Sequence, residues 1–104
     1  MKLLVSPAQL SGFSPEQWLR RLGYALIESR EGGVSFVRRL SGGFYPRFHL
    51  YVEPSGDKFS FNLHLDQKKA SYEGITRHSG EYDGELVAEE INRLKQNLGG
   101  DLFA

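Results

Sequence analysis

Hydrophobic and polar residues alternate most regularly in the segment FHLYVEPSGDKFSFNLHLD, residues 48–66. Alternation with a period of two places successive side chains on opposite faces of a strand. The segment therefore predicts two antiparallel strands, 45–53 and 58–65, joined by a turn at 54–57. One face of this hairpin is expected to pack on the core. Its apolar positions are Phe48, Leu50, Val52, Phe59, Phe61, Leu63 and Leu65.

Two further strand-like runs precede the hairpin, at 24–30 and 34–40. Glycine-bearing turns at 31–33 and 41–43 bound them, and glycine reaches positive φ without strain. Short turns between such runs are typical of neighbouring antiparallel strands. The sequence thus predicts a four-stranded antiparallel meander, with the register of the first two strands open by one residue.

A helix is expected at each end of this meander. Residues 15–22 follow a capping box of Ser14 and Gln17, have Pro15 at the first helical position and end at Gly23. Residues 83–98 carry apolar side chains at three- and four-residue spacing. The segment 66–82 between sheet and second helix shows no such period and is expected to be a loop. Loops of this length are often functional.

These elements predict a single α+β domain over residues 1–104. Their order is α-β-β-β-β-α, a four-stranded antiparallel β-meander with two helices on one face.

The charge of the chain is zero overall but unevenly distributed. Residues 1–72 hold ten Lys/Arg against six Asp/Glu, and residues 73–104 hold three against seven. This excludes a uniformly basic nucleic-acid binder and leaves a basic patch on the first part.

Location and assembly are predicted from equally simple features. The chain has no cysteine, so it has neither disulfides nor thiolate metal sites. The opening MKLLVSPAQL has only three consecutive large apolar residues, too few for a signal sequence, and no segment approaches a membrane span. We expect a cytoplasmic protein without membrane contact, as a monomer or a homodimer.

The polar face of the hairpin is the candidate site. Pairing residue 53 with 58 would place His49 opposite Asn62 and Arg47 opposite His64. Guanidinium and aromatic planes suit a small anion or an unstacked base of a nucleic acid, and a protein partner is a further alternative. The candidate ligand-binding residues are Arg47, His49, Tyr51, Asn62 and His64, joined from the loop by Tyr72, Arg77 and His78.

Two other interpretations of this face remain open. His49, His64, Asp66 and His78 have the donor atoms that zinc or manganese prefers, and they would support a metal-dependent or acid–base hydrolase, although their spacing matches no compact ligand motif. Alternatively, loop 66–82 or a second copy of the chain covers the face, and its polar groups satisfy one another.

One segment resembles a known family. QWLRRLGYALIESREGGVSFVRR is similar to the opening of HicA-type toxins, small RNA-cleaving proteins with a fold like that of double-stranded-RNA-binding domains. The resemblance covers about residues 14–52 and implies RNA binding or cleavage. That family has its catalytic histidine just after the glycine turn, where this chain has Val34 and Ser35.

A second resemblance covers the C-terminal half. HLDQKK…YEG…HSGEYDGE is similar to sequences of an uncharacterised family of small bacterial proteins, and this similarity implies no activity. Together these observations favour a small binding module, rather than an enzyme, that uses the polar sheet face and loop 66–82. The alternatives are the hydrolase on the same face and an RNA-binding or RNA-cleaving protein of the HicA type.

Overall fold

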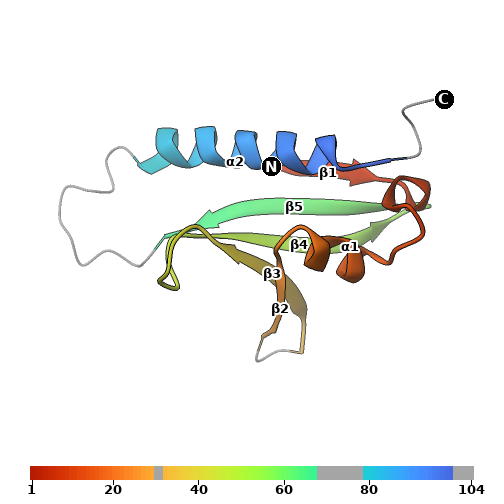
Figure 1. Cartoon of the computed structure of the whole chain (residues 1–104), viewed down its shortest axis with the longest axis horizontal. Helices are drawn as coiled ribbons and strands as arrows, with labels where there is room; N and C mark the ends of the chain where they lie inside the picture. The colour runs from red at the N-terminus through yellow and green to blue at the C-terminus, as the bar shows by residue number, and fades with distance from the viewer. Residues whose placement is uncertain (30–31, 68–78, 100–104) are drawn as a thin grey trace.

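The computed structural model describes residues 1–29, 32–67 and 79–99 and contains an antiparallel sheet with two α-helices (Figure 1). The α+β class predicted from the sequence is confirmed. The elements in chain order are β1 (Lys2–Val5), a 3-10 helix η1 (Pro7–Leu10), α1 (Pro15–Arg21), β2 (Ala25–Glu28), β3 (Val34–Arg39), β4 (Arg47–Ser55), β5 (Lys58–Asp66) and α2 (Ser79–Gln96).

The sheet has five strands in the order β1-β5-β4-β3-β2, so the prediction of four strands was wrong. The four predicted strands form the meander from β2 to β5. The additional strand, β1, pairs antiparallel with β5 and places Leu3 opposite Phe61. A run as short as Lys2–Val5 has too few residues to show a period, and its pairing partner lies more than fifty residues away.

The turn between β4 and β5 is tighter than predicted. Ser55 pairs with Lys58, and Gly56 adopts a φ of +62°, as a two-residue hairpin turn requires. The expected pairing of His49 with Asn62 was therefore wrong by two residues, and His49 lies opposite His64. Because the shift is even, every side chain keeps its predicted face.

The helices differ from their predicted ranges mainly in α2. In α1 the capping box is formed: the Ser14 N–H donates to Gln17 Oε1 at 3.0 Å, and the Gln17 N–H donates to Ser14 Oγ at 3.1 Å. Helix α2 begins at Ser79 rather than at 83. The predicted loop 66–82 was therefore too long at both ends, because Asp66 belongs to β5. Acidic residues are favourable in the first turns of a helix even where no apolar stripe marks its start.

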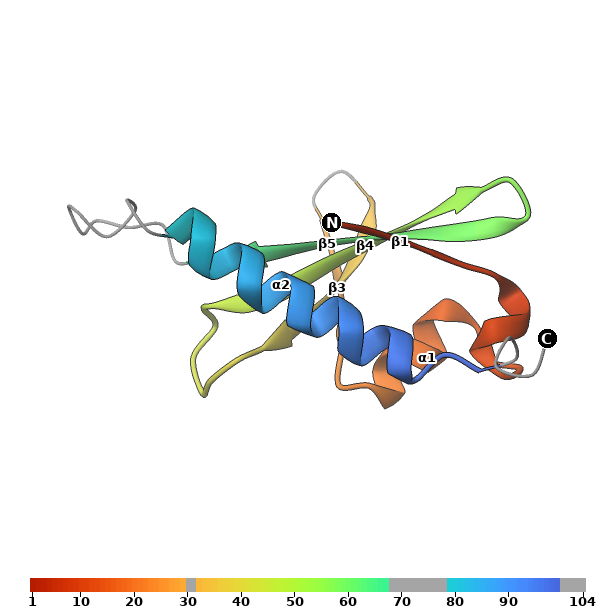
Figure 2. The same ribbon diagram turned by 90° about the horizontal axis from the view of Figure 1, so that it is seen from above.

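Both helices pack on one side of the sheet. Figure 2 shows α2 crossing the sheet with α1 beside the C-terminal end of α2, where Arg93 Nη2 donates to the Leu22 carbonyl at 2.9 Å. The two helices and one sheet face share a single core. Its buried residues include Leu3, Val5, Phe36, Phe48, Leu50, Phe61 and Leu63 from the sheet and Trp18, Leu19, Val87, Ile91, Leu94 and Leu98 from the helices and the end of α2.

A buried carboxylate links α2 to the rest of the fold. Glu90, which is 4% exposed, accepts hydrogen bonds from the Tyr24 hydroxyl at 2.6 Å and from Arg93 Nε and Nη2 at 2.8 and 2.9 Å. Arg38 Nη1 lies 3.6 Å from the same carboxylate. A buried charge needs this degree of compensation.

The ionisation of this cluster follows from its contacts. Burial by itself would raise the pKa of Glu90, but the hydrogen bonds from Arg93 and Tyr24 and the charges of Arg93 and Arg38 outweigh burial, so the pKa lies below its usual value. Burial is the main cause that raises the pKa of Tyr24, and the hydrogen bond to Glu90 raises it further. Glu90 is therefore an anion and Tyr24 a neutral donor at neutral pH.

The position of the core predicts that alanine substitutions at two residues of β5 differ widely in their effect on the free energy of unfolding. Phe61 is fully buried and meets Trp18 edge-on at 5.9 Å between ring centroids, so Phe61→Ala should lower the free energy of unfolding by roughly 3–5 kcal/mol. His64 is exposed, so His64→Ala should cost less than about 1 kcal/mol. Urea denaturation of both variants measures the difference, and equal losses would contradict the assignment of the two faces.

The lowered pKa of Glu90 predicts a pH dependence. An unfolded glutamate takes up its proton near pH 4.3, whereas Glu90 in the folded protein takes it up at lower pH. The stability contributed by this carboxylate is thus complete above about pH 4.3 and is lost as pH falls through the folded pKa. Between pH 6 and pH 3, wild type should lose more unfolding free energy than Glu90→Gln. Glu16→Gln, at an exposed ion pair with Arg20, is the control and should behave as wild type. Equal losses in wild type and Glu90→Gln would contradict the assigned role of Glu90.

Candidate functional site

The candidate site lies on the sheet face that points away from the core. We call it the polar sheet face, and the strand register assigns its side chains in rows. Cross-strand partners form one row of Arg39, Arg47 and Asp66, a second of Ala25, Val37, His49 and His64, and a third that includes Ile27, Ser35, Tyr51, Asn62 and Lys2.

His49 is held at both ring nitrogens. Its Nδ1 lies 2.7 Å from Asp66 Oδ2, and its Nε2 lies 2.7 Å from Ser35 Oγ. These partners come from the strands on either side, β5 and β3, and the His49 side chain is only 13% exposed. The central strand thus carries an imidazole fixed by its two neighbours.

The chemistry of the partners assigns the tautomer of His49. An ionised carboxylate only accepts hydrogen bonds, so Nδ1 must be the donor to Asp66. In the neutral ring, Nε2 is then an acceptor and takes the hydroxyl proton of Ser35. Both nitrogens are thus engaged by hydrogen bonds within the protein.

Three rings adjoin one another on this face. Tyr51 stacks on His49, with centroids 4.6 Å apart and planes at 27°, and meets His64 edge-on at 5.7 Å. Tyr51 is 41% exposed, and His64 is exposed as well. The fixed imidazole therefore supports a tyrosine that is open to solvent.

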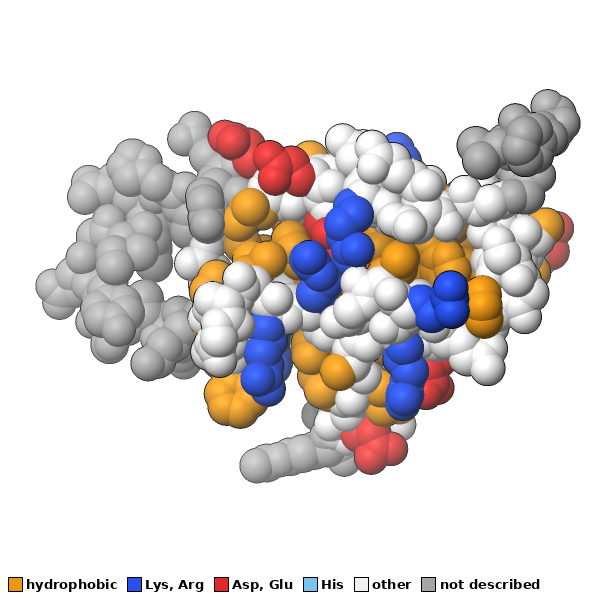
Figure 3. All heavy atoms as spheres, in the orientation of Figure 1, with side chains coloured by type: hydrophobic (Ala, Val, Ile, Leu, Met, Phe, Trp, Pro, Cys, Tyr) orange, Lys and Arg blue, Asp and Glu red, His pale blue; other side chains and the backbone are white. Residues whose placement is uncertain are grey.

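Two arginine–aromatic pairs lie at one end of this face, at the turn between β3 and β4. The guanidinium of Arg47 lies 4.9 Å from the centre of the Tyr45 ring, and that of Arg39 lies 4.4 Å from the Phe44 ring. Both aromatic side chains come from the turn between β3 and β4 and are exposed. Arg47 also places Nε 3.3 Å from Asp66 Oδ2. Figure 3 views the molecule from the side, with the histidines of the polar sheet face out of view, and shows basic side chains over the middle of that side.

The chain Asp66–His49–Ser35 has the connectivity of an acid–base relay. In such a relay the hydroxyl must reach the substrate as a nucleophile. Ser35 is 7% exposed, and its hydroxyl is hydrogen-bonded to His49 Nε2. Its hydroxyl is therefore suited to orienting His49 rather than to attacking a bound molecule.

The structure brings together most of the sequence-predicted residues. Arg47, His49, Tyr51, Asn62, His64 and Asp66 share the polar sheet face. Tyr72, Arg77 and His78 lie outside the described residues. Among residues 1–29, 32–67 and 79–99, no three His, Asp or Glu side chains come together as a metal site would require, and the four-residue zinc or manganese site with His78 stays a prediction.

Sequence reasoning missed Ser35 and the aromatic pair Phe44 and Tyr45, and it left open whether Arg38 or Arg39 lies on this face beside Arg47. The register of 34–40 was open by one residue, which left the facing of Ser35 and Arg39 undetermined. The structure places Arg39 on the polar sheet face and Arg38 on the core side, against Glu90. The alternation of Ser35, Val37 and Arg39 with the buried Phe36 was the available signal.

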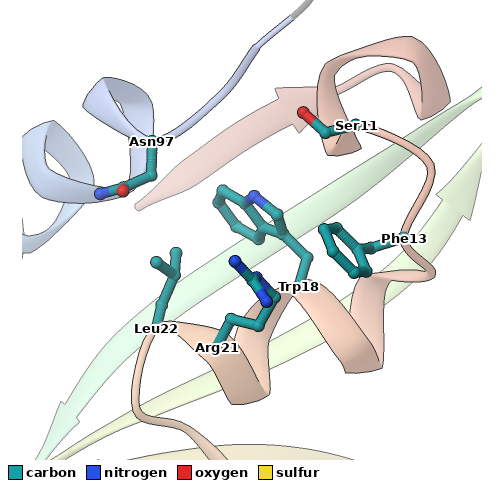
Figure 4. Close-up of a pocket in the computed structure, with 6 residues that line it drawn as sticks. All are labelled: Ser11, Phe13, Trp18, Arg21, Leu22 and Asn97. Carbon is teal, nitrogen blue, oxygen red and sulfur yellow. The ribbon is translucent and has the colours of Figure 1, made fainter.

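A hollow of about 560 Å³ lies elsewhere (Figure 4). It lies open between α1 and the residues that follow η1 and α2, and in Figure 4 the Arg21 guanidinium lies beside Trp18. Among the described residues of its lining, Arg21 is the one with a charge, so they provide no second charged group to fix a ligand. The lining residues are Ser11, Phe13, Trp18, Arg21, Leu22 and Asn97.

No family model, curated protein or solved structure matches this chain. Within the described part of the chain, no helix has the length and hydrophobicity needed to span a bilayer.

The two-sided contacts of His49 predict its tautomer in solution. At pH 8, long-range ¹H–¹⁵N NMR spectra should show the neutral His49 ring protonated at Nδ1, because Asp66 accepts only there. In Asp66→Ala the proton should move to Nε2, where Ser35 Oγ can accept it. The exposed His64 ring is the internal reference. An Nε2–H tautomer of His49 in wild type would contradict the assigned contacts.

Proposed function

We propose that this protein is a cytoplasmic binding module that holds single-stranded nucleic acid on its polar sheet face. The observation that carries the proposal is the solvent-open Tyr51, which contacts His49 and His64 and shares its sheet face with the two arginine–aromatic pairs. Unstacked bases bind to aromatic rings, and guanidinium groups bind both bases and phosphates.

The charge of this face supports an anionic ligand of modest affinity. By the strand register it carries Lys2, Arg39, Arg47 and Lys58 against Glu53 and Asp66, a formal balance of +2. The whole chain has no net charge, so long-range attraction is weak. Stacking must therefore supply much of the binding free energy.

The acid–base hydrolase and the HicA-type nuclease are weaker candidates. Both need a catalytic group that reaches the bound ligand, and the Asp66–His49–Ser35 chain directs both imidazole nitrogens into the protein. The binding module needs only the exposed rings and the arginines.

Binding should depend on Tyr51. A fluorescently labelled single-stranded oligonucleotide of about ten nucleotides should bind in an anisotropy titration, more weakly as salt is raised. Tyr51→Ala should weaken binding by roughly 5- to 150-fold, the loss of one stacked base. Tyr51→Phe keeps the ring and should bind as wild type.

Two outcomes would contradict this proposal. Equal affinities of wild type and Tyr51→Ala for the oligonucleotide would show that the rings are not part of the binding interface. An oligonucleotide shortened during incubation with wild type, but not with Ser35→Ala or His49→Ala, would make the protein a nuclease instead.

A further inference from the structure

A basic hollow of about 490 Å³ lies beside β3, where β2 begins. The pairing of these strands stops at Ala25 opposite Val37, whereas β3 continues through Arg38 to Arg39. The space that a longer β2 would fill is therefore open. Its volume falls within the range of ordinary small-ligand pockets.

The lining of this hollow is chemically divided. Ala25, Ile27 and Val37 provide an apolar floor, and Phe44 from the β3–β4 turn forms an aromatic wall. Arg38, Arg39 and Arg47 also line it, and within the part of the chain that the structure describes its lining includes no Asp or Glu. This combination suits a ligand with a ring at one end and an anion at the other.

Two of the three guanidinium groups are held in place from outside the hollow. Arg47 uses Nε toward Asp66, which leaves its two terminal amino groups for a ligand. Arg38 lies 3.6 Å from Glu90, which is itself fixed by Arg93. Such arginines are already oriented before a ligand arrives.

The charge count indicates the kind of anion. Three arginines (Arg38, Arg39 and Arg47) line the hollow, and two of them contact carboxylates behind it, Arg38 with Glu90 and Arg47 with Asp66. Since Glu90 is also paired with Arg93, this connected group of four arginines and two carboxylates has a formal balance of +2. A phosphate inside a nucleic-acid strand carries one negative charge. A phosphate monoester carries nearly two at neutral pH and offers three acceptor oxygens. The monoester matches the hollow better.

We propose that this hollow binds the terminal phosphate of the single-stranded nucleic acid, with the terminal nucleoside against Phe44 and the apolar floor. The inference rests on the proposed function and adds recognition of a phosphorylated end to it. Arg47 and Tyr51 are four residues apart on β4, on the order of 13 Å, so a short strand can contact both the hollow and the rings.

The test compares one oligonucleotide sequence with a 5′-phosphate, with a 3′-phosphate, and with hydroxyl groups at both ends. One of the phosphorylated forms should bind wild type at least about tenfold more tightly than the hydroxyl form, as charge-assisted hydrogen bonds imply. In Arg39→Gln this ratio should fall close to one. Tyr51→Ala should weaken all forms and keep the ratio.

The control variant is Arg20→Gln, on the exposed surface of α1, which should leave all affinities and the ratio unchanged. Equal binding of all three forms by wild type, or an undiminished ratio in Arg39→Gln, would overturn the end-recognition inference and leave the binding module in place. Absence of binding to every form would overturn both.

Discussion

Nine consecutive residue pairs join β4 to β5, from Arg47 and Asp66 to Ser55 and Lys58, and their register determines both faces of the sheet. Because side chains alternate, the same pairing that buries Leu50 and Leu63 against the helices sets His49 beside Asp66 on the other side. A slip of one residue would expose the core and bury the polar groups together. The core and the candidate site thus depend on one ladder.

Sequence reasoning recovered the parts that depend on local pattern. The alternation in 48–65 identified which hairpin side chains face the core and which lie on the polar sheet face. The predicted pairing of β4 with β5 was wrong by two residues, and because two is an even number, no side chain changed face. Sequence reasoning failed where the strands or side chains that pair are distant in the sequence. The strand Lys2–Val5 has no period of its own and exists because β5 offers an edge. Ser35 could not be assigned to His49, because that contact depends on the register of a third strand.

The buried cluster at Glu90 connects stability with the surface. Glu90 is anchored to α2 and receives hydrogen bonds from Tyr24 and Arg93. Through the same carboxylate it restrains Arg38, which lines the hollow beside β3. The charged groups of this cluster would each be costly to bury alone, and they compensate one another. One of them, Arg38, also lines the hollow proposed as a ligand site. A glutamate gives no local sign in the sequence that its partners will enclose it, so the burial of Glu90 could not be predicted from 83–98.

The contacts at both nitrogens of His49 have a thermodynamic consequence. A side chain that is immobilised on binding loses rotamer freedom, at a cost of about 0.5–1.5 kcal/mol for flexible groups. His49 has already lost that freedom on folding, through Asp66 and Ser35. The imidazole that contacts Tyr51 therefore loses little further conformational entropy when a ligand binds. The entropy loss of ordering this ring lowers the stability of the folded domain and not its affinity for a ligand.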